Sequence, residues 1–318
     1  MPATDPPPGV DYTRVLARSG GIDAGAVLAG LAVTLLVMFA IAPSLLQSLI
    51  FGLGYALRGH PDTSLDAYSA AARAFKYPEG MLAAHLQLAA LIPVTLLVVR
   101  YVHHRRGVWL SSVQPGVRWR YLAIVVVVAL VVLNGMYWLT TGRHSFVWSP
   151  QSGLGGWIVL IVLTAPLQAA GEEYLFRGYL TQAFGALLPG RLAASRWLAV
   201  LVSACVFGLA HGLHQDLPLL LTRIGFGALM GALVVITGGL EASIAAHAVN
   251  NVSTFIVAAL TPGGVASAMA LSSATWSQAG INLAAYSIVG LIAWTVGTSL
   301  HVARTTPAAG LAPTCPIA

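Results

Sequence analysis

Two adjacent glutamates, Glu172 and Glu173, interrupt a long apolar stretch of the sequence. No charged residue lies between Arg143 and Glu172, and Arg177 follows the pair by about one helical turn. A charge at the centre of a membrane helix costs roughly +2.5 to +3.5 kcal/mol, against about −0.3 to −0.6 kcal/mol for each Leu, Ile, Val or Phe. Three such costly charges indicate a functional site that faces protein or water instead of lipid.

The spacing of these charges predicts different surroundings for the two carboxylates. In a helix, successive side chains point about 100° apart, so Glu172 and Glu173 face different directions. Glu173 and Arg177 are four residues apart and can form an ion pair along one face. Glu172 then points elsewhere, and a carboxylate in a low-dielectric cavity can serve as a general base. The alternative interpretation is that these charges form a buried structural ion pair that fixes the packing of the helices.

Further polar groups fall in later apolar runs. His211 follows Phe207 by one turn, and His247 and Asn251 share one face of a later helix. An imidazole and an amide on one buried face can donate hydrogen bonds to a developing oxyanion. Taken singly, each is better explained as a hydrogen-bonded core residue or as a polar contact between membrane helices.

Together, these side chains suggest hydrolysis. A general base, an imidazole and an oxyanion-stabilising pair are what water needs to attack an amide. Glu172, His211 and His247 are also a plausible zinc-ligand set. The spacing does not choose between a metal-bound and a metal-free water. Arg223, the other ionisable residue well inside a predicted span, is expected to extend toward an interface.

The elements that must position these residues are membrane helices. The 318 residues are 57% hydrophobic and only 8% charged, against about 25% charged residues in soluble domains. This predicts an all-α fold, a polytopic transmembrane helical bundle of about eight spans. The fourth span is long and is expected to break at Pro166. The predicted spans are residues 24–57, 81–99, 121–140, 157–188, 197–213, 217–236, 240–260 and 281–302.

Other features of the sequence concern orientation and packing. The net charge of +6 comes mostly from arginines that flank the apolar runs, as the positive-inside rule predicts, so nucleic acid is not an expected partner. We expect a multi-pass protein of the cell membrane with both termini cytoplasmic. Residues 1–23, rich in Pro, Gly and charge, are predicted to be a disordered tail. Gly227 and Gly231 have the spacing of a close helix contact.

The ordered set of motifs resembles the CPBP family, the CAAX proteases and bacteriocin-processing enzymes, also called the Abi family. The family pattern is EExxxR, then FxxxH, then HxxxN, each in a membrane span. The resemblance covers residues 150–258, a CPBP-like catalytic transmembrane core. Residues 24–149 are then variable N-terminal spans, and residues 259–318 hold the last span and a cytoplasmic tail. The matching residues are Glu172, Glu173, Arg177, Phe207, His211, His247 and Asn251.

The resemblance implies an intramembrane endopeptidase that acts on a membrane-associated protein or peptide in the lipid bilayer. It implies that Glu172 is the general base and that His211 helps to hold the water. His247 and Asn251 would stabilise the oxyanion, while Glu173 and Arg177 orient the site. Zinc stays open as a cofactor. The alternative function is a non-catalytic membrane immunity or scaffold protein that keeps the polar site for binding. A transporter would also use intramembrane Glu and His, but no inverted repeat is present.

Overall fold

The computed structural model describes residues 4–17, 23–59, 62–188 and 194–307. Within these ranges the chain forms helices, and the only β-type pairings are isolated bridges. Seven helical segments are long and apolar enough to cross a membrane, and the apolar helix Ser195–Ala210 is shorter. The predicted all-α bundle of about eight spans is therefore confirmed.

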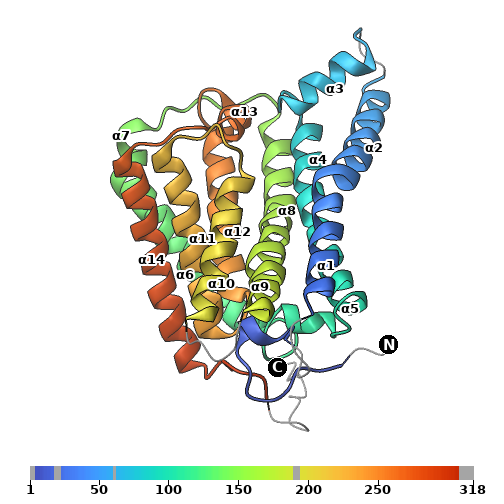
Figure 1. Ribbon diagram of the computed structural model, residues 1–318. Helices are drawn as coiled ribbons and strands as arrows, with labels where there is room; N and C mark the ends of the chain where they lie inside the picture. Colours follow the sequence, from blue (N-terminus) through green and yellow to red (C-terminus); the bar gives the residue numbers. More distant parts are fainter. Residues whose placement is uncertain (1–3, 18–22, 60–61, 189–193, 308–318) are drawn as a thin grey trace.

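The crossing segments are built from one or more helices each (Figure 1). The first combines α1 (Ala24–Leu36), the π-helical turn η2 (Val37–Ile41) and α2 (Ala42–Leu57), and the short α3 (Leu65–Arg73) follows it. The remaining elements are α4 (Pro78–Ala89), α5 (Leu91–Tyr101), η3 (Gly107–Leu110), α6 (Trp119–Tyr137), η4 (Trp138–Gly142), α7 (Arg143–Ser145), α8 (Leu154–Glu173), η5 (Tyr174–Leu180), α9 (Thr181–Leu187), α10 (Ser195–Ala210), α11 (Leu217–Thr237), α12 (Glu241–Ala259), α13 (Gly264–Met269) and α14 (Trp276–Ser299).

The N-terminal segment and the segment after α14 lie together at one end of the bundle (Figure 1). The amide of Gly9 donates to the carbonyl of Thr306, and the amide of Thr306 donates to the carbonyl of Val10, both at 2.9 Å. These hydrogen bonds hold the two segments on the same side of the bundle. That this side is cytoplasmic stays a prediction.

The disordered tail predicted for residues 1–23 is wrong for residues 4–17. Tyr12 and Val15 are fully buried and Leu16 nearly so, and Tyr12 begins a short 3-10 turn, η1 (Tyr12–Arg14). The Tyr12 hydroxyl donates to the carbonyl of Leu110. Three spaced apolar residues thus anchor a segment whose Pro and Gly content indicated disorder. Residues 1–3 and 18–22 lie outside the described residues.

The predicted break of the fourth span at Pro166 is also wrong. The helix α8 continues through Pro166 to Glu173. The irregular turn comes later, as the π-helical segment η5, and every residue of η5 is buried. Single π-helical turns inside α-helices are frequent at functional sites, and this one begins directly after the two glutamates.

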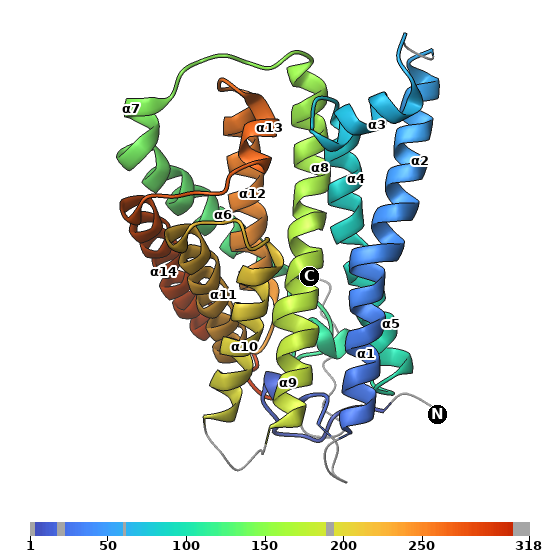
Figure 2. The ribbon, with the colours of Figure 1, turned by 45° about the horizontal axis from the view of Figure 1, so that its top comes forward.

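Glycines allow the close helix contacts that fix the site. Figure 2 shows α8 between α4 and α12. A Cβ atom on Gly171 would collide with the backbone carbonyl of Leu88 in α4, so only glycine fits there. Between α10 and α11, a Cβ atom on Gly227 would lie 3.0 Å from the Cα of Ala204, and one on Gly231 would lie 2.7 Å from a methyl group of Val200. The close contact predicted from the glycine spacing is confirmed.

Candidate active site

Glu173 is fully buried at the end of α8 and lies at the centre of a hydrogen-bonded cluster. Its carboxylate accepts a hydrogen bond from the Ser243 hydroxyl at 2.7 Å. Nδ1 of His247 lies 2.7 Å from its other oxygen, and Nη1 of Arg177 lies 3.0 Å from that same oxygen. The ion pair predicted from the four-residue spacing is confirmed. Both carboxylate oxygens are engaged by neighbouring side chains, so Glu173 is held in place.

The Arg177 side chain is only 1% exposed and lies between aromatic rings. Its guanidinium carbon is 4.0 Å from the centre of the Phe207 ring and 5.0 Å from that of Phe226, distances at which a cation is attracted to the ring. Its contact with Glu173 is an ion pair by distance, and within the described part of the chain its nitrogens make no well-aligned hydrogen bond. Glu173 therefore supplies the only negative charge in contact with this buried cation among the described residues.

Glu172 is buried, with 7% of its surface exposed, but its surroundings differ. Its Oε2 lies 3.4 Å from Nε2 of His247. Across the described ranges, no other side chain forms an ion pair with Glu172 and none donates a hydrogen bond to it. Two carboxylates adjacent in sequence are thus distinct: Glu173 is saturated with partners, and Glu172 has oxygen atoms left for a reacting group.

His247 connects the two glutamates across α8 and α12. A hydrogen bond from Nδ1 to Glu173 fixes the ring and directs Nε2 toward Glu172. The Phe226 ring packs edge to face against the imidazole, with 5.1 Å between the ring centres. The His247 side chain is therefore held on two sides, with one nitrogen toward the less engaged carboxylate.

His211 lies directly after the last residue of α10, where its side chain is exposed. Its Nδ1 lies 2.8 Å from the carbonyl oxygen of Phe207 and donates to it. The imidazole also packs against the Phe207 ring, with 4.6 Å between the ring centres. Because Nδ1 is the donor, Nε2 is left as an acceptor. The phenylalanine of the FxxxH motif thus contacts both His211 and Arg177.

Asn251 is held by a chain of amide and hydroxyl groups. Its Nδ2 donates to Oε1 of Gln168 at 2.7 Å, and its Oδ1 accepts from Nδ2 of Asn250 at 3.1 Å. The hydroxyl of Tyr286, on α14, donates to Asn250 at 2.7 Å. Gln168 and Tyr286 are not among the predicted site residues. Gln168 lies four residues before Glu172, so helical spacing could have identified it.

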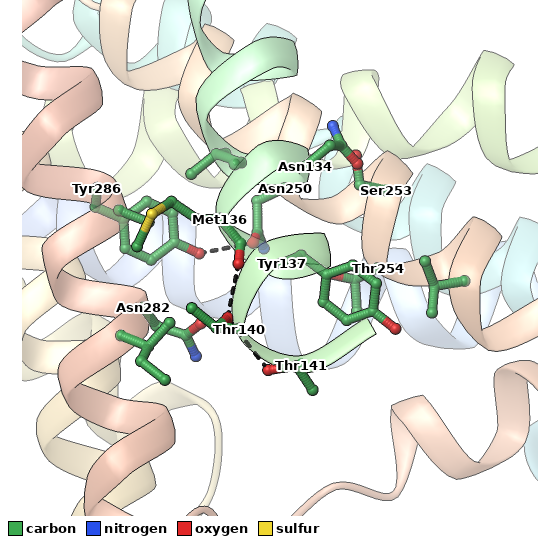
Figure 3. A pocket seen from close by; sticks show the side chains of 14 residues that line it. Asn134, Met136, Tyr137, Thr140, Thr141, Asn250, Ser253, Thr254, Asn282 and Tyr286 are labelled. Atoms are coloured by element: carbon green, nitrogen blue, oxygen red, sulfur yellow. Dashed lines mark hydrogen bonds between the residues drawn. The ribbon is translucent and has the colours of Figure 1, made fainter. Parts of the chain in front are cut away.

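A cavity of about 170 Å³ lies on the other side of Asn250, between α6, η4, α12 and α14. Figure 3 shows Tyr286 and Asn250 joined by a hydrogen bond at its wall. Its lining carries amide and hydroxyl groups and no charged residue, and it includes none of the six predicted site residues. The cavity is therefore separate from the predicted site residues, and Asn250 and Tyr286, which line it, connect it to Asn251 and Phe226.

The side chains found here do not form a complete zinc site. Glu172 and His247 have two possible metal-ligating atoms, which lie 3.4 Å apart. His211 is not placed as a third ligand beside them. Across the described ranges, no group of three His, Cys, Asp or Glu side chains is placed to hold a metal ion. The zinc set of Glu172, His211 and His247 is left as an untested prediction.

Arg223 is a charged neighbour of the site, held by a residue of the loop before α11. Its Nη1 donates to Oε1 of that residue, Gln215, at 2.6 Å, and the extension of Arg223 toward an interface stays a prediction. Its charge acts on both Glu172 and His211. Arg223 also lies three residues before Phe226, on the same side of α11. It is therefore a neighbour of the site that the motifs do not include.

The chain is similar to known proteins over this region. Residues 154–253 match the family described as "Type II CAAX prenyl endopeptidase Rce1-like". The protein "Uncharacterized protein YyaK" of Bacillus subtilis (strain 168) is 24% identical over 176 residues, which are 52% of this chain and 57% of the relative. The match thus spans little more than half of either protein. No solved structure matches the chain.

The matched segment begins with α8 and extends into α12, so it contains every residue of the three motifs. The family resemblance inferred from those motifs is confirmed. Residues 154–253 of this chain are therefore similar to the type II CAAX prenyl endopeptidase Rce1-like family.

Proposed function

We propose that this protein is an intramembrane endopeptidase in which Glu172 activates water to hydrolyse a peptide bond of a membrane-associated substrate. The family match supports CAAX-type intramembrane protease activity in general. The observation that carries the mechanism is the contrast between the neighbouring carboxylates. Glu173 is occupied by Arg177, His247 and Ser243, whereas the one ion-pair partner of Glu172 among the described residues is Nε2 of His247, at 3.4 Å.

In the first step, Glu172 takes a proton from a water molecule, and the water oxygen attacks the carbonyl carbon of the scissile bond. Nε2 of His211 is the nitrogen not engaged by Phe207, and it accepts a hydrogen bond from the same water. A new carbon–oxygen bond forms, and the carbonyl oxygen becomes an oxyanion. Glu172 is then a neutral carboxylic acid.

His247 and Asn251 stabilise that oxyanion. Nδ1 stays bound to Glu173, and a proton on Nε2 is donated in a hydrogen bond to the oxyanion. Asn251 uses one amide hydrogen for Gln168 and keeps the second for the oxyanion. Removing one donor of this kind typically lowers kcat by about 10²- to 10³-fold.

In the last step, the carbon–nitrogen bond breaks and Glu172 gives its proton to the departing amine. The carboxylate is thereby restored, and the other product carries the new carboxyl group. This sequence uses one water for each bond cleaved and needs no further reactant.

The helices around the site support a membrane-associated substrate. Leu163 and Leu167, on the same helix as the glutamates, are 64% and 48% exposed, as expected for side chains that face lipid. The protein is then a multi-pass protein of the cell membrane, and the flanking arginines support cytoplasmic termini. The family match supports a CAAX-like sequence in the substrate.

The test compares wild-type protein with Glu172→Gln in lipid vesicles. The probe is a mixture of membrane-anchored peptides, and cleavage is measured by mass spectrometry in H₂¹⁸O. We expect one ¹⁸O atom in each new carboxyl group and a loss of about 10²- to 10⁴-fold in the variant. Asp66→Asn, an exposed carboxylate on α3, is the matched control and should keep wild-type activity.

Undiminished cleavage by Glu172→Gln would refute the assigned base. The immunity or scaffold alternative predicts a different result. In that case neither protein cleaves any peptide, and a deletion phenotype is restored by Glu172→Gln but not by a bulky change such as His211→Trp.

A further inference from the structure

Arg223 is an unexplained charge inside a membrane helix. It is the seventh residue of α11 and the only Asp, Glu, Lys or Arg between Asp216 and Glu241. Its side chain is partly exposed. A charged residue at such a position is costly and marks an ion or substrate contact by default.

No carboxylate of the described chain forms an ion pair with Arg223. Its hydrogen-bond partner, the Gln215 amide, is neutral, and that amide is fixed because its Nε2 donates to the carbonyls of Gly208 and Gly212, each at 2.7 Å. Asp216 is adjacent to Gln215 in sequence, but it caps α11 and accepts from the amides of Leu219 and Ala274, each at 3.0 Å. Arg223 is therefore positioned without being neutralised.

The free charge lies on the side of α11 that faces the site. Phe226, three residues on, packs against the His247 ring. Within the site, Glu173 and Arg177 cancel each other, and Glu172 is reserved as the base. Arg223 acts electrostatically on Glu172 but does not contact it. The site thus has a positive charge with donors to spare, since a guanidinium carries five N–H groups.

We propose that Arg223 binds a carboxylate of the peptide substrate close to the scissile bond. This rests on the proposed endopeptidase function and names the substrate feature that the enzyme selects. Arg223 lies about 4.5 Å along α11 from Phe226, which packs against His247, so its long side chain can reach a group bound beside the site. The carboxylate is either the free C-terminus of the peptide or an acidic side chain close to the bond.

The experiment uses three membrane-anchored peptides with the same scissile sequence. One ends in a free carboxylate, one in an amide, and one in an amide with an aspartate in place of the last residue. Both kcat and KM are measured for wild type, Arg223→Gln and Arg223→Lys in lipid vesicles. Arg196→Gln, an exposed arginine at the start of α10, is the matched control.

We expect wild type to prefer a carboxylate peptide over the plain amide by about 10- to 100-fold, the range for a hydrogen bond to a charged group. The preference should lie in KM, as for uniform binding. Arg223→Gln should abolish it, Arg223→Lys should keep part of it, and Arg196→Gln should keep all of it. Preference for the free terminus alone identifies the terminal carboxylate, and equal preference for the aspartate peptide shows that a side chain suffices.

Equal losses for all three peptides with Arg223→Gln would overturn the proposal and indicate an arginine that supports the fold or binds lipid phosphate. A binding measurement distinguishes failure of the carboxylate proposal from failure of the proposed endopeptidase function. The affinities of fluorescent free-acid and amide peptides are measured with Glu172→Gln protein, with and without Arg223→Gln. A preference that depends on Arg223 supports the carboxylate contact even if no peptide is cleaved, and equal affinities refute it.

Discussion

The imidazole of His247 is oriented by Glu173, the neighbour in sequence of the proposed base. Nδ1 lies 2.7 Å from Oε1 of Glu173, whereas Nε2 lies 3.4 Å from Oε2 of Glu172. One carboxylate therefore sets the direction of the ring, and the other faces the nitrogen that is left. Because the residues are adjacent on a helix, they point in different directions, which allows the two roles to coexist in one buried site.

This relationship predicts different results for the two Glu→Gln substitutions. Glu173→Gln leaves Arg177 buried without its counter-charge, which typically costs about 3–5 kcal/mol. We expect Glu173→Gln to lower both thermal stability in detergent and peptide cleavage. Glu172→Gln should lower cleavage while the unfolding temperature stays close to that of wild type.

A double variant separates charge balance from catalysis. Glu173→Gln combined with Arg177→Met removes both members of the ion pair, so most of the stability should return. Activity should not return, because the neutral amide of Gln at position 173 holds Nδ1 of His247 more weakly than the carboxylate does. If Glu173→Gln unfolds at the wild-type temperature, the ion pair does not have the structural role assigned to it.

The part of the site that the sequence predicts is the part that depends on local spacing. Glu173 and Arg177 are four residues apart, so any helix brings them together. The contact between His247 and Glu173 joins α12 to α8, across 74 residues. The order of the motifs implied that these residues share one site. The residue spacing within a single helix cannot predict which of the two carboxylates His247 contacts, because that depends on how α12 packs against α8.

The residues that were missed lie outside local patterns. Tyr286 reaches Asn250 from α14, and its position depends on how α14 packs against its neighbours. Arg223 is placed by a glutamine in a loop. The burial of the N-terminal residues was not predicted, because the Pro and Gly content near Tyr12 indicated disorder. The apolar residues that anchor this segment cover only about one turn, which is too short for a periodic pattern.

Gly171 is predicted to control the position of both glutamates. A Cβ atom there meets the carbonyl of Leu88, which is backbone and cannot rotate away. Gly171→Ala should therefore push α8 from α4, destabilise the protein by about 1–3 kcal/mol as overpacking does, and reduce cleavage. Gly290→Ala, where a Cβ atom meets nothing within 4 Å, is the control. Equal unfolding temperatures for the two variants would contradict the tight contact.

Metal removal tests the open question of zinc. The described donor atoms form no three-ligand group, so we predict that cleavage persists after dialysis against a strong chelator. The measurement is the cleavage rate before and after chelation, with metal content determined on the same sample. If chelation abolishes cleavage and zinc restores it, Glu172, His211 and His247 must rearrange into the ligand set that their residue types allow.

Tyr286 is predicted to act on the reaction through Asn250 and Asn251. Tyr286→Phe removes the donor to Asn250, which braces Asn251. We expect kcat to fall about 10-fold with little change in KM, because the amide is used only as the oxyanion develops. Tyr121→Phe, which loses a similar hydroxyl bond to the carbonyl of Ala293, should lose comparable stability, about 1 kcal/mol, and keep its activity. In an Asn251→Ala background, Tyr286→Phe should cost nothing further, and a full additional 10-fold loss there would show that Tyr286 does not act through Asn251.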